Sequence, residues 1–188
     1  MNYNIRRMIF LIIALIWAIV IFAFSAKPGD ESENQSIKVG MTVCNIFVPG
    51  FDNLQEYEQV DMAKKIDYPV RKTAHATEYA ILAGCVLGAV TPGFIRWKNG
   101  LTAICTAVIY AATDEIHQLF VSGRSGRITD VLIDGCGAVA GTLIILLISR
   151  IIVMCRKKEN QLIIFLAFFV CKSIILNDLY LIQYGRYI

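Results

Sequence analysis

The stretch MIFLIIALIWAIVIFAF, residues 8–24, is an apolar run without a single charge. At about 1.5 Å rise per residue, it is near the minimum length with which an α-helix can cross the hydrocarbon core of a bilayer. A cleaved signal peptide is the alternative, because Ala23 to Ala26 resembles a small-residue cleavage site. The run is longer than a usual signal core, however, so we interpret residues 8–24 as a first transmembrane helix.

The rest of the chain shares this apolar character. Of its 188 residues, 56% are hydrophobic and 18% are charged, a balance far from that of a soluble domain. The net charge of +3 does not indicate nucleic-acid binding, because the basic residues lie at the ends of apolar runs. The six cysteines form no CxxC pair, and no HExxH, GxSxG or nucleotide-binding loop occurs. We therefore expect no nucleic-acid partner and none of the standard hydrolase or nucleotide sites.

Further apolar segments predict the remaining helices of a bundle. Three of them are long enough to span a membrane, at residues 70–90, 101–121 and 129–154. A fifth segment, residues 162–181, contains Lys172 and Asp178, so it could span, lie in the interface or pack against the bundle. The expected fold is all-α, a polytopic transmembrane bundle of four helices plus a fifth, in one membrane domain over residues 1–188. The sequence does not indicate an oligomeric state.

Basic residues give the expected orientation, because cytoplasmic ends of membrane helices carry the excess of Lys and Arg. When the segments alternate, eight of these residues fall on one side, at positions 6, 7, 96, 98, 150 and 156–158. We therefore predict a cytoplasmic N-terminus and an external loop over residues 27–68, with a short amphipathic piece within residues 54–66. Arg124 and Arg127 are exceptions, because they lie in a short loop on the outer side.

Charged residues of three predicted helices gather at the outer end of the bundle. Helical spacing places His75 and Glu78 on one face of the second helix and Asp114 on a face of the third, with Glu115 at its margin. On the fourth helix, Asp130 and Asp134 align above a GxxxG pair, Gly137 and Gly141, which permits close helix approach. Ionisable groups inside a membrane cost about 2.5 to 3.5 kcal/mol each, so a functional site is the first interpretation. A network that only holds the helices together is the alternative.

The residue types suggest chemistry for this site. Carboxylates and an imidazole can act as general acids and bases, and the candidates for catalysis are His75, Glu78, Asp114, Glu115 and Asp130. Arg124 and Arg127, in SGRSGRITD, suit a phosphate or carboxylate, although anchoring to lipid head groups is an equal alternative. Asp and Glu oxygens could also hold a divalent metal, but no spacing indicates one, so no cofactor is firmly implied.

Three motifs of this chain resemble those of the VanZ-like family of bacterial membrane proteins. They are FSAKPGDESENQS at residues 24–36, RKTAHATEYAILAG at residues 71–84, and TDEIHQLFVSGRSGRITDVLIDGCGAVAG at residues 113–141. The resemblance extends to about Ile152, and the segment after Glu159 matches no motif. Position 134 is Asp here, where many members have Asn. By position, the resemblance points to Lys72, His75, Glu78, Tyr79, Asp114, Glu115, Gln118, Arg124, Asp130 and Asp134.

This resemblance sets the functional expectation. It implies a cell-envelope protein of the bacterial plasma membrane, similar to accessory factors of glycopeptide resistance whose name-giving member lowers susceptibility to teicoplanin. Together with the residues, it predicts a site that binds or acts on an anionic envelope lipid or a lipid-linked wall precursor. The expected ligand-binding residues are Lys72, Tyr79, Gln118, Arg124, Arg127 and Asp134. Whether the protein is an enzyme, a binding protein without catalysis or an assembly factor stays open at this point.

Overall fold

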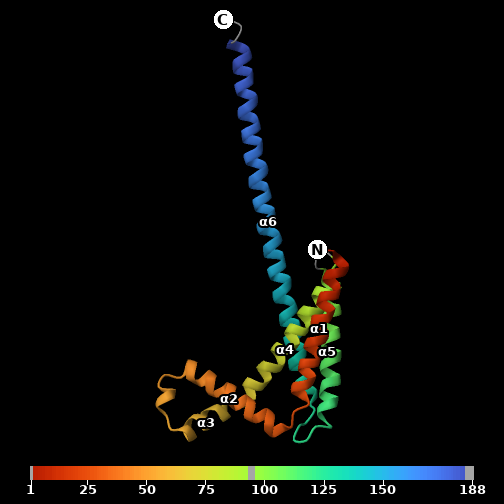
Figure 1. Ribbon diagram of the computed structural model, residues 1–188, viewed down its shortest axis with the longest axis vertical. Coiled ribbons are helices and arrows are strands. Elements are labelled where there is room, and N and C mark those ends of the chain that lie inside the picture. Colours follow the sequence, from red (N-terminus) through yellow and green to blue (C-terminus); the bar gives the residue numbers. More distant parts are fainter. Residues whose placement is uncertain (1, 93–95, 185–188) are drawn as a thin grey trace. The chain divides into compact units, whose positions relative to one another are not determined.

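The computed structural model describes residues 2–92 and 96–184, and describes side chains as far as residue 156. The described residues are helical almost throughout and include no strand (Figure 1). The elements are α1 (Tyr3–Ser25), α2 (Gly29–Phe47), η1 (Phe51–Asn53), α3 (Glu56–Lys65), α4 (Asp67–Val90), α5 (Trp97–Gln118) and α6 (Ile128–Tyr184). The chain divides into two compact units, residues 1–145 and 146–188, and every contact discussed below lies within the first.

Three of these helices are long and apolar enough to cross a membrane, over Tyr3–Ser25, Asp67–Val90 and Ile128–Arg156. They correspond to the first, second and fourth predicted spans, and they make the chain a helical membrane protein. The third predicted span, α5, is not among them. Its charged residues lie near both ends, with Lys98 in the first turn and Asp114 and Glu115 in the last two turns, which lowers its apolar character. That α5 also crosses the membrane remains a prediction.

The fourth and fifth predicted helices are a single element. Helix α6 continues from Ile128 to Tyr184, so the predicted segments 129–154 and 162–181 are not separated by a turn. The connecting residues 155–161, CRKKENQ, are polar but include neither glycine nor proline, the residues that most often end a helix. Charge alone therefore did not break the helix. The side chains of residues 162–181 lie outside the described part.

Small side chains allow the helices of the first unit to pack closely. On α5, Ala103, Ala107 and Ala111 recur every four residues and have no exposed surface. They form one face of the helix, which packs mainly against α4. Tyr79 and Ile21 complete the core between α1, α4 and α5. The large side chains on the opposite face of α1, such as Leu15, are exposed and suited to lipid.

Helices α4 and α6 approach each other at the expected glycine pair. A Cβ atom on Gly137 would lie 2.0 Å from the Ala76 carbonyl oxygen, and one on Gly141 would lie 2.7 Å from that of Ala80. Only glycine fits at such distances, because each contact is with backbone. The close approach inferred from the GxxxG spacing is therefore present, and it brings the first turns of α6 against α4.

The polar segment expected as an external loop contains two helices. The short amphipathic piece expected within residues 54–66 is α3, which begins with a capping box between Gln55 and Glu58. Helix α2 was not expected, because its charged residues hide the apolar spacing of Ile37, Cys44 and their neighbours. It packs against α3 where Gly40 meets Ala63, and it also contacts α4.

The predicted orientation can be tested by cysteine labelling in intact cells. Glu33 on α2 and Ser125 between α5 and α6 are both exposed, whereas Lys98 lies at the opposite end of α5. With Cys44 and the other native cysteines replaced by serine, Glu33→Cys and Ser125→Cys should react with a membrane-impermeant thiol reagent. Lys98→Cys should react only after the cells are opened. The reverse pattern would invert the topology.

Candidate functional site

The polar residues meet at the end of the first unit where α1 ends and α4 begins, which we call the site end. Two connections that are far apart in sequence dock on each other here. The Gly29 N–H donates a hydrogen bond to the Ser122 carbonyl at 3.0 Å. A Cβ atom on Gly29 would lie 2.1 Å from the Gly123 carbonyl oxygen, and Gly123 has a φ of 71° that L side chains rarely adopt. The α1–α2 corner and the α5–α6 loop therefore form one joint.

Beneath this joint lies a buried hydrogen-bond network between α1 and α5. The Ser25 hydroxyl donates to Asp114 Oδ2 at 2.5 Å, and the Gln118 amide donates to the same oxygen at 3.0 Å. Gln118 also reaches Glu115 Oε1 at 3.3 Å. The other oxygen of Glu115 accepts from the Arg127 backbone N–H at 2.8 Å. Asp114, Glu115 and Gln118, predicted from the sequence as site residues, are thus joined through one another and through Ser25.

Arg124 ties the α5–α6 loop to the end of α1. Its Nε donates to the Lys27 carbonyl at 3.1 Å and its Nη2 donates to the Phe24 carbonyl at 3.0 Å. Nη1 reaches Gln118 Oε1 at 3.5 Å. Arg124 therefore bonds one carbonyl in the last turn of α1, where helix carbonyls lack partners within the helix, and one just beyond the end of α1. Burial and the neighbouring Arg71 lower the pKa of the Arg124 guanidinium from its ordinary value, and nearby carboxylates, including Asp114, oppose that shift.

Two further pairs of predicted site residues lie on α4 and α6. Lys72 Nζ is 2.6 Å from Asp130 Oδ2, an ion pair that links the two helices. His75 Nδ1 is 3.9 Å from Glu78 Oε2, which is beyond hydrogen-bond distance. The backbone carbonyl of Glu78 accepts from Trp17 Nε1 of α1 at 2.8 Å.

The structure places the last two predicted residues deeper in the core. Tyr79 has no exposed surface and Asp134 is 1% exposed. Among the described residues, neither the Tyr79 hydroxyl nor the Asp134 carboxylate oxygens have a hydrogen-bond partner. The Tyr79 ring instead lies 6.3 Å from that of Tyr110. These two residues are therefore not connected by hydrogen bonds to the network around Asp114.

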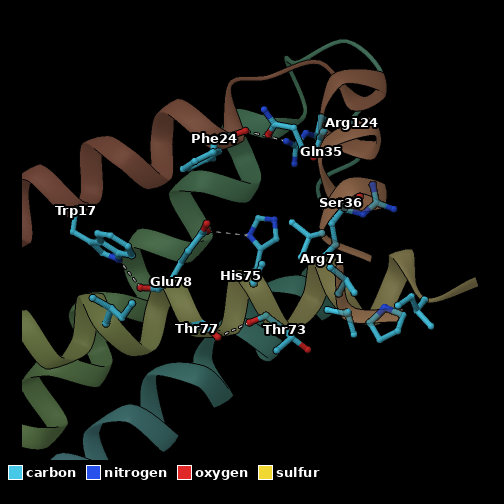
Figure 2. A pocket seen from close by; sticks show the side chains of 18 residues that line it. Trp17, Phe24, Gln35, Ser36, Arg71, Thr73, His75, Thr77, Glu78 and Arg124 are labelled. Carbon is cyan, nitrogen blue, oxygen red and sulfur yellow. Dashed lines mark hydrogen bonds and ion pairs between the residues drawn. The ribbon is translucent and has the colours of Figure 1, made fainter. Parts of the chain in front are cut away.

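A large cavity of about 720 Å³ opens beside these residues, between α1, α2 and α4. Apolar side chains from the three helices make most of its wall, including Phe24, Val39, Val43 and Ile81. His75, Glu78, Arg71 and Arg124 provide the charged or titratable part of the lining. Figure 2 shows His75 and Glu78 pointing toward one another at the cavity, with Trp17 and Phe24 on α1. We call this space the large cavity.

Asp67 fastens α2 to the start of α4 at the edge of the large cavity. Its Oδ1 accepts a hydrogen bond from the Ser36 hydroxyl, and its Oδ2 pairs with Arg71 Nη2 at 2.6 Å. This carboxylate holds Arg71 in place at the lining. No group of three or more His, Cys, Asp or Glu side chains is placed to hold a metal ion within the described residues.

The fold and this site define a class, a helical membrane protein whose charged residues gather at one end of the helices beside an apolar cavity. The model of the VanZ/LLP1 family matches residues 10–149. The chain belongs to this family, as the three motifs indicated. No curated protein and no solved structure matches the chain.

Sequence reasoning missed several residues of this site. Helical periodicity placed Arg71 on the same face as His75 and Glu78, but Arg71 was not assigned a role in the site. Ser25 lies in the first family-like motif, which marked the segment without assigning a role. Trp17 carries no local signal, because only tertiary packing brings it to the large cavity. Gln35 and Ser36 on α2 lie at the end of the same motif as Ser25, which assigned no role to them either.

Proposed function

We propose that this protein binds an anionic lipid or a lipid-linked wall precursor of the bacterial envelope, at a site open to the outer side of the plasma membrane. The observation that carries the proposal is the large cavity, whose wall is mostly apolar and carries a group of cationic and titratable side chains. A volume of about 720 Å³ falls within the range of pockets that enclose one small molecule. Such a wall suits hydrocarbon, and the charged group suits an anionic head.

Binding fits the geometry better than catalysis does. Of the five residues expected to be catalytic, only His75 and Glu78 line the large cavity. Asp114 and Glu115 are buried and accept hydrogen bonds from Ser25, Gln118 and the Arg127 backbone. Asp130 is paired with Lys72. Acid or base chemistry by His75 and Glu78 on a bound lipid is the second candidate, because both side chains face the place where a ligand would lie.

A binding function also accounts for the effect that the family resemblance implies. A protein that holds an envelope lipid or wall precursor at the outer surface would reduce the access of a lipophilic glycopeptide to that surface. Lower susceptibility to teicoplanin is therefore part of the proposal. It requires no reaction and no cofactor.

Quenching of Trp17 fluorescence tests whether a lipid enters the large cavity. The chain has two tryptophans, and Trp97 is 70% exposed at the other end of α5, so Trp97→Phe leaves Trp17 as the only reporter. An anionic lipid with brominated chains, added at a low mole fraction to the detergent-solubilised protein, should quench Trp17 saturably. A neutral lipid with the same chains should quench it about ten-fold less well, because it forms no charged contacts.

The matched control moves the reporter to the lipid-facing side of α1. In a Trp17→Phe, Trp97→Phe background, Leu15→Trp places the indole where the native side chain is 63% exposed. This position should report only non-specific contact, without saturation. Equal quenching at positions 15 and 17 would contradict the proposed binding site.

A further inference from the structure

We infer that the anionic group is a phosphate, bound in a second and smaller pocket next to the large cavity. The inference rests on the proposed function, because it names the chemistry of the ligand's head. The small pocket has a volume of about 150 Å³ and lies between α4, the α1–α2 corner and the α5–α6 loop. Its charged or titratable lining consists of Arg71, Lys72, His75, Arg124, Arg127 and Asp130.

Positive charge dominates the small pocket. Four side chains that carry a positive charge line it, against the single carboxylate of Asp130, which is already paired with Lys72 at 2.6 Å. The neighbouring acids Asp67, which is paired with Arg71 at 2.6 Å, Asp114 and Glu115 do not line it. The oxygens of Asp114 and Glu115 accept hydrogen bonds from side chains and backbone behind the pocket, so they offset its charge without facing a ligand.

The arrangement of these cations fits a phosphate better than a carboxylate. Arg71 and Lys72 come from α4, whereas Arg124 and Arg127 come from the α5–α6 loop, so the donors approach from two elements. A carboxylate has two oxygens and one negative charge, and a single guanidinium can donate a hydrogen bond to each of the two oxygens. A terminal phosphate has three acceptor oxygens and nearly two charges, so it can use donors from several directions at once.

Head and tail can belong to one molecule, because the two spaces share part of their lining. Arg71, His75 and Arg124 line both the large cavity and the small pocket. A phosphate held in the small pocket would therefore place an attached hydrocarbon chain at the mouth of the large cavity. The ligand class that meets both conditions is a lipid with a terminal phosphate.

Arg127 is the residue that tests the small pocket alone. It lines the small pocket but not the large cavity, and its side chain is exposed. Its backbone N–H is held by Glu115, a contact that a substitution of the side chain leaves in place. Within the described part of the chain, its guanidinium makes no ion pair with a carboxylate.

The experiment uses the Trp97→Phe protein and one set of brominated chains on three head groups. These are phosphatidic acid with its phosphate monoester, a succinyl ester of diacylglycerol with its carboxylate, and diacylglycerol itself. The phosphate lipid should bind about ten-fold more tightly than the carboxylate lipid, and Arg127→Gln should remove about that factor. Lys64→Gln, which removes an exposed cation of α3 that lines neither space, should have no effect.

A second variant and a competitor complete the test. Ser125→Glu introduces a carboxylate into the lining of the small pocket and should weaken phosphate-lipid binding while leaving diacylglycerol unaffected. Inorganic phosphate should relieve Trp17 quenching by the phosphate lipid, because both would compete for the small pocket. If it binds without relieving the quenching, the small pocket takes free phosphate and the claim of one ligand across both spaces is overturned.

The outcomes separate the two proposals. Equal affinities for the phosphate and carboxylate lipids would overturn the phosphate inference and leave the anionic-lipid proposal standing. So would an Arg127→Gln protein that binds the phosphate lipid as tightly as the protein with Arg127. Quenching no stronger at Trp17 than at the Leu15→Trp control would overturn both.

Discussion

Arg124→Lys is expected to destabilise the protein by about 2 to 3 kcal/mol and to weaken lipid binding about ten-fold or more. The guanidinium donates to the Lys27 carbonyl, the Phe24 carbonyl and Gln118 through three different nitrogens. A single ammonium group keeps the charge but cannot reach these acceptors together. The α1–α2 corner, which borders both the large cavity and the small pocket, would then lose its fastening to the α5–α6 loop.

Thermal unfolding in detergent measures the first effect and Trp17 quenching measures the second. Arg127→Lys is the matched control, because it retains the backbone bond to Glu115 and lies outside the contacts that hold α1. Its melting temperature should equal that of the wild type. An Arg124→Lys protein with wild-type melting temperature and affinity would show that Arg124 serves only as a positive charge.

Gly137→Ala is expected to produce the second large effect, a loss of about 1 to 3 kcal/mol of stability or more. The added Cβ would lie 2.0 Å from the Ala76 carbonyl oxygen, which belongs to backbone, so α4 and α6 would have to separate. Separation would also stretch the ion pair between Lys72 and Asp130.

The control for this substitution is Gly135→Ala on the same helix. Its added Cβ would lie 3.3 Å from Val108 Cγ2, the end of a side chain that can shift slightly. Thermal unfolding of the two variants at matched concentration should therefore separate them clearly. Equal melting temperatures would show that α4 and α6 do not pack as closely as the glycines indicate.

The sequence predicted the membrane helices well where apolar runs were long and uncharged. Residues 8–24 fall within α1, and α4 begins at Asp67, three residues before the predicted start. Helix α2 was not predicted, because it has few apolar residues at helical spacing among many polar ones. The continuity of α6 was not predicted, because the charged run within residues 155–161 indicated a boundary between two helices.

The candidate site was predicted as a set of residues at one end of the helices, but its contacts were not. Helical periodicity assigns a residue to a face, and it does not say which neighbour that face meets. It therefore could not show that Asp114 meets Ser25, that Arg124 holds the end of α1, or that Asp134 has no hydrogen-bond partner among the described side chains. The catalytic and ligand-binding roles assigned to these residues remain predictions.

Photo-crosslinking tests most directly whether the large cavity holds the hydrocarbon part of an anionic lipid. A phosphate lipid with a diazirine in its chain would be irradiated with the full-length protein in a bilayer, and the labelled peptides mapped by mass spectrometry. We predict labelling of Val39, Val43 and Ile81, which line the large cavity, and loss of that labelling in Arg124→Lys. Labelling confined to lipid-facing residues such as Ile109, which is 65% exposed, would contradict the central claim.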